Sequence, residues 1–235
     1  KRGIGAFAEY TWGGDKISKD EYKSLFVHRT FGPQWKNQNF TFIDSLEPAV
    51  GAWVNAFVVD KSHRNKLKKN ENAKEKLLID LPKVNQKGDW AMRYSTRIEE
   101  AKKYVKQSSI ITKKMEALIQ RNVKNTFMIE VYSQVLSLTD FSFETLLLLE
   151  QYDRAASEKE AQEALAKIMS LRVKFNDLRS EFERVYGLTR TLKKPDNYIL
   201  DQDHHHHPAN QTINFDWQFY SELLFLDKIE EHFKE

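Results

Sequence analysis

From residue 90 to residue 187 the apolar residues recur at gaps of three and four almost without interruption, which favours long amphipathic helices. Residues 143–152, with four consecutive leucines, predict a helix that is buried on most sides. Ser157 and Glu160 have the spacing of a capping box, which opens the clearest helix, and Gly187 is its predicted C-cap. The stripes are Tyr94, Ile98, Ala101, Val105, Ser108, Met115, Leu118 and Ile119, then Phe127, Val131, Val135 and Leu138, then Leu171, Phe175, Leu178, Phe182 and Val185.

These helices are predicted to form an antiparallel bundle. A loop over residues 189–212 precedes a last helix, which we expect to run from about Asn214 to the end of the chain. Four or five long helices with short links are typical of such bundles. The heptad seam is too short to favour a coiled coil. No repeat of fixed period is visible, so a helical solenoid is the lesser alternative.

The first 33 residues follow a different pattern, that of one strand, one loop and one helix. Residues 3–10 form a short apolar run, and residues 11–14 are turn-forming. Ser18 and Glu21 form a capping box ahead of a helix over residues 20–31, which Gly32 and Pro33 end. Because a single parallel strand needs neighbours, we expect this unit to be the remnant of a larger sheet.

Between these two parts the pattern is less regular. A helix is expected to begin near Asp44 or Ser45, with Pro48 in its first turn, where a missing N–H is harmless. Its predicted apolar face is formed by Val50, Trp53, Val54 and Phe57. Residues 61–88 are polar and indicate a connector with one short buried anchor at residues 77–82.

Composition excludes several functional classes. The chain has 235 residues, 40% of them hydrophobic, and a net charge of +3, so no strong field indicates nucleic acid. The basic run at residues 61–69 lacks the interleaved aromatic residues that stack on bases, and it is interpreted as a solvated face. Without cysteine there is no disulfide, thiol catalysis or cysteine-bound zinc. No apolar stretch approaches the roughly 20 residues that span a bilayer.

No complete catalytic set is visible, and no cofactor is predicted. The chain has no glycine-rich phosphate loop, no G-x-S-x-G turn and no H-E-x-x-H motif. Paired acids such as Glu99 and Glu100 fall on polar helix faces, where solvated surface is the simplest interpretation.

Glu9, Tyr10 and Trp12 are the candidate sugar-binding residues. In a (β/α)8 barrel the active site lies at the C-terminal ends of the strands, where these residues would stand. An indole covers the apolar face of a pyranose, and a carboxylate accepts hydrogen bonds from vicinal hydroxyls. The alternative is that Glu9 is a solvated strand end and that Trp12 fills the base of a loop.

The run from residue 201 to residue 207 contains four adjacent histidines, of which His204 and His206 are weak candidates for metal ligands. Successive side chains in an extended chain alternate in direction, so adjacent histidines rarely all reach one ion. A polar surface loop without metal is the favoured interpretation.

Residues 5–13, with Glu21, Tyr22 and residues 29–32, resemble the last barrel strand and last helix of glycoside hydrolase family 20. These enzymes are the β-N-acetylhexosaminidases, here of a type common among gut Bacteroidetes. Residues 88–98 and 198–207 look like the helical region that follows the barrel in such proteins. The resemblance implies the last barrel unit at residues 1–33, a connecting helix and linker at 34–89, and a C-terminal helical bundle at 90–235.

The resemblance also implies a function for the larger protein. Family 20 enzymes retain configuration by substrate assistance and use an Asp-Glu pair on an earlier barrel strand. That pair is absent from this chain, which alone is expected to be inactive. The family order on the last strand is Trp-x-Glu, whereas here Glu9 precedes Trp12. The bundle is expected to support the barrel or to mediate homodimerisation, with Trp35, Trp53 and Trp90 at a covered interface.

The implied partners are therefore the rest of the hydrolase chain and, through it, a glycan containing N-acetylhexosamine. A periplasmic or secreted location is expected, with a cytoplasmic one left open. Two alternatives remain. One is a hexosaminidase of the family 84 type, which has two neighbouring aspartates in place of Asp-Glu. The other is a stand-alone helical interaction module without enzymatic activity.

Overall fold

The computed structural model describes residues 11, 17–60, 74–121, 123–189 and 219–234. Within these ranges the chain is mainly helical, as predicted, and contains no strand, only an isolated antiparallel bridge between Val58 and Leu78. The predicted strand at residues 3–10, and with it the barrel remnant, lies outside the described residues. The elements are α2 (Lys19–Phe31), η2 (Asn37–Phe40), α3 (Phe42–Trp53), α5 (Lys74–Leu77), α6 (Asp89–Arg93), α7 (Ser95–Gln120), α8 (Thr126–Asp153), α9 (Glu158–Met169), α10 (Leu171–Gly187) and α12 (Tyr220–Phe233).

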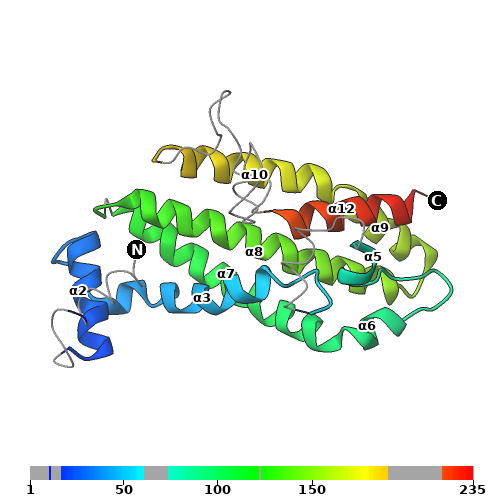
Figure 1. The fold of residues 1–235 in the computed structure, drawn as a ribbon, viewed down its shortest axis with the longest axis horizontal. Helices are drawn as coiled ribbons and strands as arrows, with labels where there is room; N and C mark the ends of the chain where they lie inside the picture. Colours follow the sequence, from blue (N-terminus) through cyan, green and yellow to red (C-terminus); the bar gives the residue numbers. More distant parts are fainter. Residues whose placement is uncertain (1–10, 12–16, 61–73, 122, 190–218, 235) are drawn as a thin grey trace, which may run out of the picture.

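Helix α8 is the centre of the fold. It has 28 residues and packs against α3, α6, α7, α9 and α10 (Figure 1). Helix α7, with 26 residues, precedes it. After a short turn, in which Asn125 adopts the left-handed conformation at φ 59°, α8 runs back along α7. None of the described helices combines the length and the apolar composition needed to span a bilayer.

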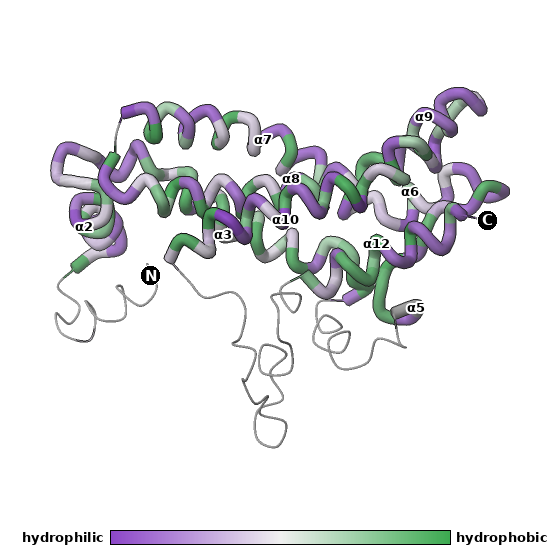
Figure 2. Tube along the Cα trace, turned by 90° about the horizontal axis from the view of Figure 1, so that it is seen from above, coloured by the Kyte–Doolittle hydropathy of each residue, from purple (hydrophilic) through white to green (hydrophobic). Residues whose placement is uncertain are grey.

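Two hydrophobic clusters hold these helices together. The main core joins residues 56–58, the anchor at residues 77–81, α6, the first half of α7 and the second half of α8 to α9, α10 and α12. The end core lies at the other end of α7 and α8, where α2, η2 and the start of α3 meet them. Hydrophilic and hydrophobic residues alternate along α7 and α8, as amphipathic helices require (Figure 2).

The capping box predicted at the start of the first helix is confirmed. The Ser18 hydroxyl accepts a hydrogen bond from the Glu21 amide at 3.3 Å, and the Glu21 carboxylate accepts one from the Ser18 amide at 2.8 Å. The helix ends at Gly32, whose φ of 115° favours glycine. Val27 and Phe31 are buried in the end core, so α2 is fixed to one end of the bundle.

Helix α3 differs from its prediction. It begins at Phe42, and Pro48 lies in its interior instead of its first turn. The buried face consists of Phe42, Ile43, Leu46 and Ala49, and the first three of these residues enter the end core. Phe57 is buried, but it lies beyond the end of the helix at Trp53.

Three further details of the helix prediction are wrong. Of the stripe predicted in α8, Leu138 is buried, whereas Phe127, Val131 and Val135 are only partly buried. Ile129 and Leu136 are the buried residues of the first half of the helix. The single helix expected after Ser157 is two helices that meet at Ser170. There the hydroxyl of Ser170 bonds back to the Lys167 carbonyl at 2.7 Å.

The third detail concerns the end of α10. Gly187 is the last helical residue and Leu188 is the C-cap, in the right-handed region. The predicted role of Gly187 as a C-cap is therefore wrong, since no left-handed residue is needed there.

The buried anchor at residues 77–82 is confirmed, with Leu77, Leu78, Ile79 and Leu81 in the main core. Trp90 is only 4% exposed and belongs to the same core. Its predicted place at an interface with the barrel or with a second copy is wrong, because the chain itself already covers it.

Candidate functional site

The residues that the sequence singled out for chemistry all lie outside the described residues. This holds for Glu9, Tyr10 and Trp12, and equally for His204 and His206. Among the residues that are described, no group of three or more His, Asp or Glu side chains is arranged to hold a metal ion. The sugar-binding and metal-binding hypotheses therefore stay predictions.

The most heavily engaged polar side chain in the described part of the chain is that of Arg97, in the first turn of α7. Its guanidinium donates to four backbone carbonyls just beyond α3: Asn55 at 2.9 Å, Ala56 at 2.8 Å, Val58 at 2.6 Å and Val59 at 3.0 Å. Burial lowers the pKa of Arg97 from its usual value, and Tyr94 and Glu100 oppose part of that shift. Arg97 thus provides hydrogen-bond donors for carbonyls that lie beyond the end of α3 and have no donor within a helix.

A second set of contacts attaches the buried anchor to its surroundings. The Trp90 indole donates to the Asp80 carbonyl at 2.6 Å, and the Tyr94 hydroxyl accepts from the Asp80 amide at 3.1 Å. The backbones of residues 57–59 and 77–79 exchange two hydrogen bonds of 2.9 Å. The short chain segment after α5 is therefore held in register on the segment that follows α3.

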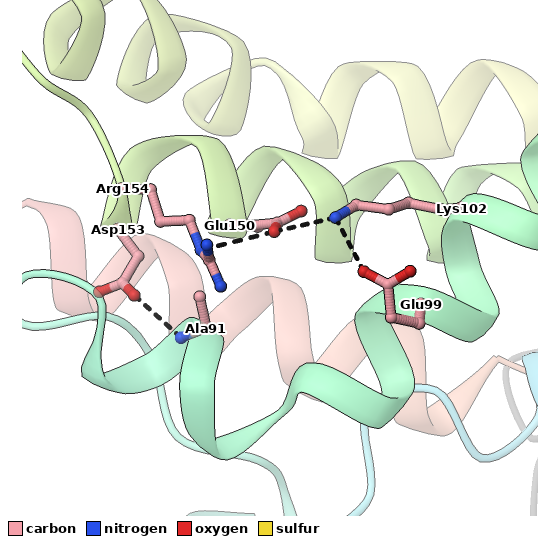
Figure 3. A network of polar contacts seen from close by, with 6 residues as sticks. All are labelled: Ala91, Glu99, Lys102, Glu150, Asp153 and Arg154. Carbon is pink, nitrogen blue, oxygen red and sulfur yellow. Dashed lines mark hydrogen bonds and ion pairs between the residues drawn. The ribbon is translucent and has the colours of Figure 1, made fainter.

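The end of α8 positions α6 (Figure 3). Asp153 is 2% exposed, and its Oδ2 accepts from the Ala91 amide at 2.9 Å, which caps the first turn of α6 from another helix. One turn earlier, Glu150 accepts from Lys102 of α7 at 3.1 Å and lies 3.5 Å from Arg154. Asp153 Oδ1 is buried and has no hydrogen-bond partner among the described residues, so only one oxygen of this acid is engaged.

The best candidate for a ligand site is a cavity of about 440 Å³ between α3 and α7. From α7, Arg97, Glu100 and Tyr104 line it at spacings of three and four, so they share one face of that helix. Pro48 and Gly51 of α3, and Asn55 just beyond its end, line the opposite side. Phe143 and Leu146 of α8 complete the lining and are both buried.

The polar groups of this cavity are partly engaged: Arg97 donates to four carbonyls, and Glu100 acts electrostatically on Arg97. Asn55 donates through Nδ2 to the Gly51 carbonyl at 2.7 Å, which leaves its Oδ1 as an acceptor. Within the described ranges, no hydrogen bond engages the Glu100 carboxylate or the Tyr104 hydroxyl. Tyr104 stacks on Phe143, with ring centres 5.0 Å apart and planes inclined by 8°. The cavity can therefore offer acceptors and an apolar wall to a small molecule.

A smaller cavity of about 240 Å³ lies beside α6 and α12. Some of its polar groups are already used: Asp80 pairs with Arg93 at 2.8 Å, and His232 bonds to the Pro82 carbonyl at 2.8 Å. Lys228, which also lines it, has an interaction partner as well. The larger cavity is for this reason the better candidate.

A carboxyl group with a shifted pKa lies elsewhere on α8. Asp140 Oδ1 is buried and has no hydrogen-bond partner among the described residues. Burial raises the pKa of Asp140 to about 6, an effect that the Ser108 hydroxyl opposes, that Glu144 adds to and that Lys174 opposes. Asp140 lines none of the cavities above, so we assign its effect to stability.

We expect Asp140→Asn to stabilise the protein at neutral pH but not in acid. A carboxyl whose pKa is higher in the folded than in the unfolded chain destabilises the fold once it loses its proton. The gain should be absent below the ordinary value of 3.8 and complete above about 6. Allowing for partial solvent exposure, about 1 to 3 kcal/mol is expected at pH 7.5 in urea unfolding. Asp177→Asn, at an exposed acid, is the control, and an equal gain at both ends of the pH range would contradict the assignment.

Sequence reasoning missed the residues of the larger cavity. The spacing of Arg97, Glu100 and Tyr104 was available as a signal, since it places an arginine, an acid and an aromatic ring on one helix face. The residues of α3 that line the other side of the cavity could not be predicted, because the start of α3 and the position of Pro48 within it were predicted wrongly.

Comparison of the chain with models of protein families, with curated proteins and with solved structures gave no match. The resemblance of residues 5–13 to family 20 hydrolases therefore stays a prediction.

Proposed function

We propose that the chain is the C-terminal helical region of a family 20-like β-N-acetylhexosaminidase and that it supports the catalytic barrel. The observation that carries this proposal is the position of α2. This helix starts at its capping box shortly after the motif at residues 5–13, and Val27 and Phe31 fix it in the end core against α3, α7 and α8. A barrel whose last helix is α2 would thereby be attached to one end of the bundle.

Support of the barrel is favoured over dimerisation as the role of the bundle. In the end core, Phe42, Leu46, Met115 and Ile129 belong to the same buried cluster as Val27 and Phe31 of α2. A barrel that continued from α2 would therefore be joined to the bundle through a well-packed contact. Through the parent enzyme, the substrate would be a glycan with N-acetylhexosamine, and the location would be periplasmic or secreted.

A stand-alone helical interaction module is the second candidate. The size of the main core favours it, because α6, α7, α8, α9, α10 and α12 all contribute to one continuous cluster. A bundle with such a core has the means to fold by itself. In that case the isolated chain should unfold in one cooperative transition, and the gene should encode no barrel.

Activity measurements test the hydrolase proposal. The product of the complete gene should hydrolyse a chromogenic N-acetyl-β-D-glucosaminide, and residues 1–235 alone should not. In the complete enzyme, Glu9→Gln should lower kcat/KM by about 10- to 100-fold, because a carboxylate that binds sugar hydroxyls would be lost. Glu163→Gln, an exposed acid on α9, is the control. Unchanged kinetics in Glu9→Gln would refute the role of this residue.

A further inference from the structure

The side of α7 that faces away from α8 carries several positive charges. Helix α7 packs on α8, α3 and α6 and lies at the edge of the bundle (Figure 2). Its buried side includes Ser108, Ile111 and Met115, whereas Ile110 is exposed. Successive residues of a helix are rotated by about 100°, so four exposed lysines lie within about 60° of Ile110. They are Lys103, Lys106, Lys113 and Lys114.

No acid balances these charges within the described part of the chain. None of the four lysines takes part in an ion pair there. Their neighbour Lys102, in contrast, contacts both Glu99 and Glu150. Residues 101–115 contain no Asp or Glu, so a lysine of this face has no acid one turn away. A helix with solvated charges typically alternates their sign, as α9 does where Lys159 pairs with Glu163.

The like charges on this face are unfavourable to the helix. Lys103 and Lys106 are three residues apart, a spacing at which equal charges repel one another and destabilise the helix. The net charge of the whole chain is only +3, so the positive field is local to this face. An anionic partner would remove the repulsion. The face is therefore suited to a partner with negative charge.

The shape of the face favours an extended surface over a small molecule. None of the four lysines lines the cavity between α3 and α7 or the cavity beside α6 and α12. The axis of α7 rises by about 16 Å between Lys103 and Lys114, so several anionic groups can lie along it. Ile110, at the centre of the face, is 55% exposed. An apolar side chain among lysines suits the boundary between lipid headgroups and acyl chains.

A nucleic acid matches this face less well. Between Lys103 and Lys114 there is no arginine, the residue that binds phosphates through two parallel hydrogen bonds. The one aromatic residue in this stretch is Tyr104, whose ring stacks on Phe143 inside the bundle and not on a base. Lysines around a single apolar residue favour a lipid surface instead.

We propose that this face of α7, formed by Lys103, Lys106, Ile110, Lys113 and Lys114, binds the surface of a bilayer that contains anionic lipids. The lysines interact with the headgroups through their charges, and Ile110 enters at the level of the headgroups. Each lysine near an anionic surface strengthens binding by about fivefold. This inference is independent of the hydrolase proposal, since it concerns only described residues of α7.

Flotation of the full chain with lipid vesicles tests the proposal. Vesicles of phosphatidylserine and phosphatidylcholine are the probe, and pure phosphatidylcholine is the control for the charge. We expect the chain to bind the anionic vesicles only, and high salt to release it. Replacing all four lysines with glutamine should lower the partition coefficient by at least about 100-fold, because four factors of about five are lost. Glutamine is a good helix former, so α7 should be retained, which circular dichroism checks.

Two further variants separate this face from charge in general. The first makes the same change in net charge at exposed lysines on other parts of the chain, and it should weaken binding by less than about tenfold. It replaces Lys19, Lys36, Lys76 and Lys83 with glutamine. The second, Ile110→Asn, leaves the charge unchanged and should weaken binding to vesicles severalfold, because an apolar side chain no longer enters the headgroup region.

A short DNA duplex distinguishes a lipid surface from a nucleic acid. We expect it to bind more weakly than the anionic vesicles at equal phosphate concentration. The proposal is overturned if the duplex binds more tightly than the vesicles, or if neutral vesicles bind as well as anionic ones. It is also overturned if the folded α7 variant binds anionic vesicles as tightly as the variant at the other four lysines. If the α7 variant does not fold, Ile110→Asn decides the question.

Discussion

Replacing Arg97 with methionine lowers the free energy of unfolding by about 3 to 5 kcal/mol, the largest effect expected for a polar residue in the described part of this chain. The change leaves four backbone carbonyls, those of residues 55, 56, 58 and 59, without their donor. Methionine keeps most of the buried stem, so the loss reports on the hydrogen bonds. Urea unfolding measured by circular dichroism gives the value.

Two controls separate the hydrogen bonds of Arg97 from its charge. Arg97→Lys keeps the charge, but one ammonium cannot span four carbonyls, so an intermediate loss is expected. Arg93→Ala breaks an ion pair with Asp80 in which both side chains are more than half exposed, and it should change stability by at most about 1 kcal/mol. A loss for Arg97→Met no greater than that for Arg93→Ala would contradict the assigned role.

Truncation of Phe225 to alanine is expected to cost about 3 to 5 kcal/mol of stability. Phe225 is fully buried on α12 and stacks on Phe57, with ring centres 4.3 Å apart and planes inclined by 13°. This pair attaches α12 to the segment that follows α3. Phe57→Ala should lower the free energy of unfolding by a similar amount.

The double variant tests whether the two rings act together. We expect the combined loss to fall short of the sum by about 1 kcal/mol, since each ring has the other as a packing partner. Leu188→Ala, at a side chain that is 65% exposed, is the control and should change stability by less than about 0.5 kcal/mol. Strict additivity, or a loss below 1 kcal/mol for Phe225→Ala, would mean that α12 does not pack as described.

Sequence patterns predicted those parts of the fold in which the local sequence is compatible with only one arrangement of buried and exposed residues. The capping box at Ser18 and Glu21 and the buried anchor at residues 77–82 are such cases. In the first half of α8, the sequence does not decide which face of the helix is buried, because it contains two overlapping apolar stripes. Tertiary contacts with the end core selected the stripe through Ile129 and Leu136, and no local signal distinguishes the two.

The candidate site was harder to predict than the helices. Arg97, Glu100 and Tyr104 can be placed on one helix face from spacing alone. Their partners come from a turn after α3 and from a glycine that leaves a space open, and both features depend on how distant helices meet. Glu9, Tyr10 and Trp12 were chosen by chemistry and by family resemblance, and they remain predictions.

The sequence of the native gene upstream of the codon for Lys1 tests the hydrolase proposal most directly. We predict about 200 or more further codons with alternating strand and helix patterns, including an Asp-Glu pair at the end of a strand. Two neighbouring aspartates in its place would indicate the family 84 type. A start codon or a signal peptide directly before Lys1 would contradict the proposal and leave a helical binding module.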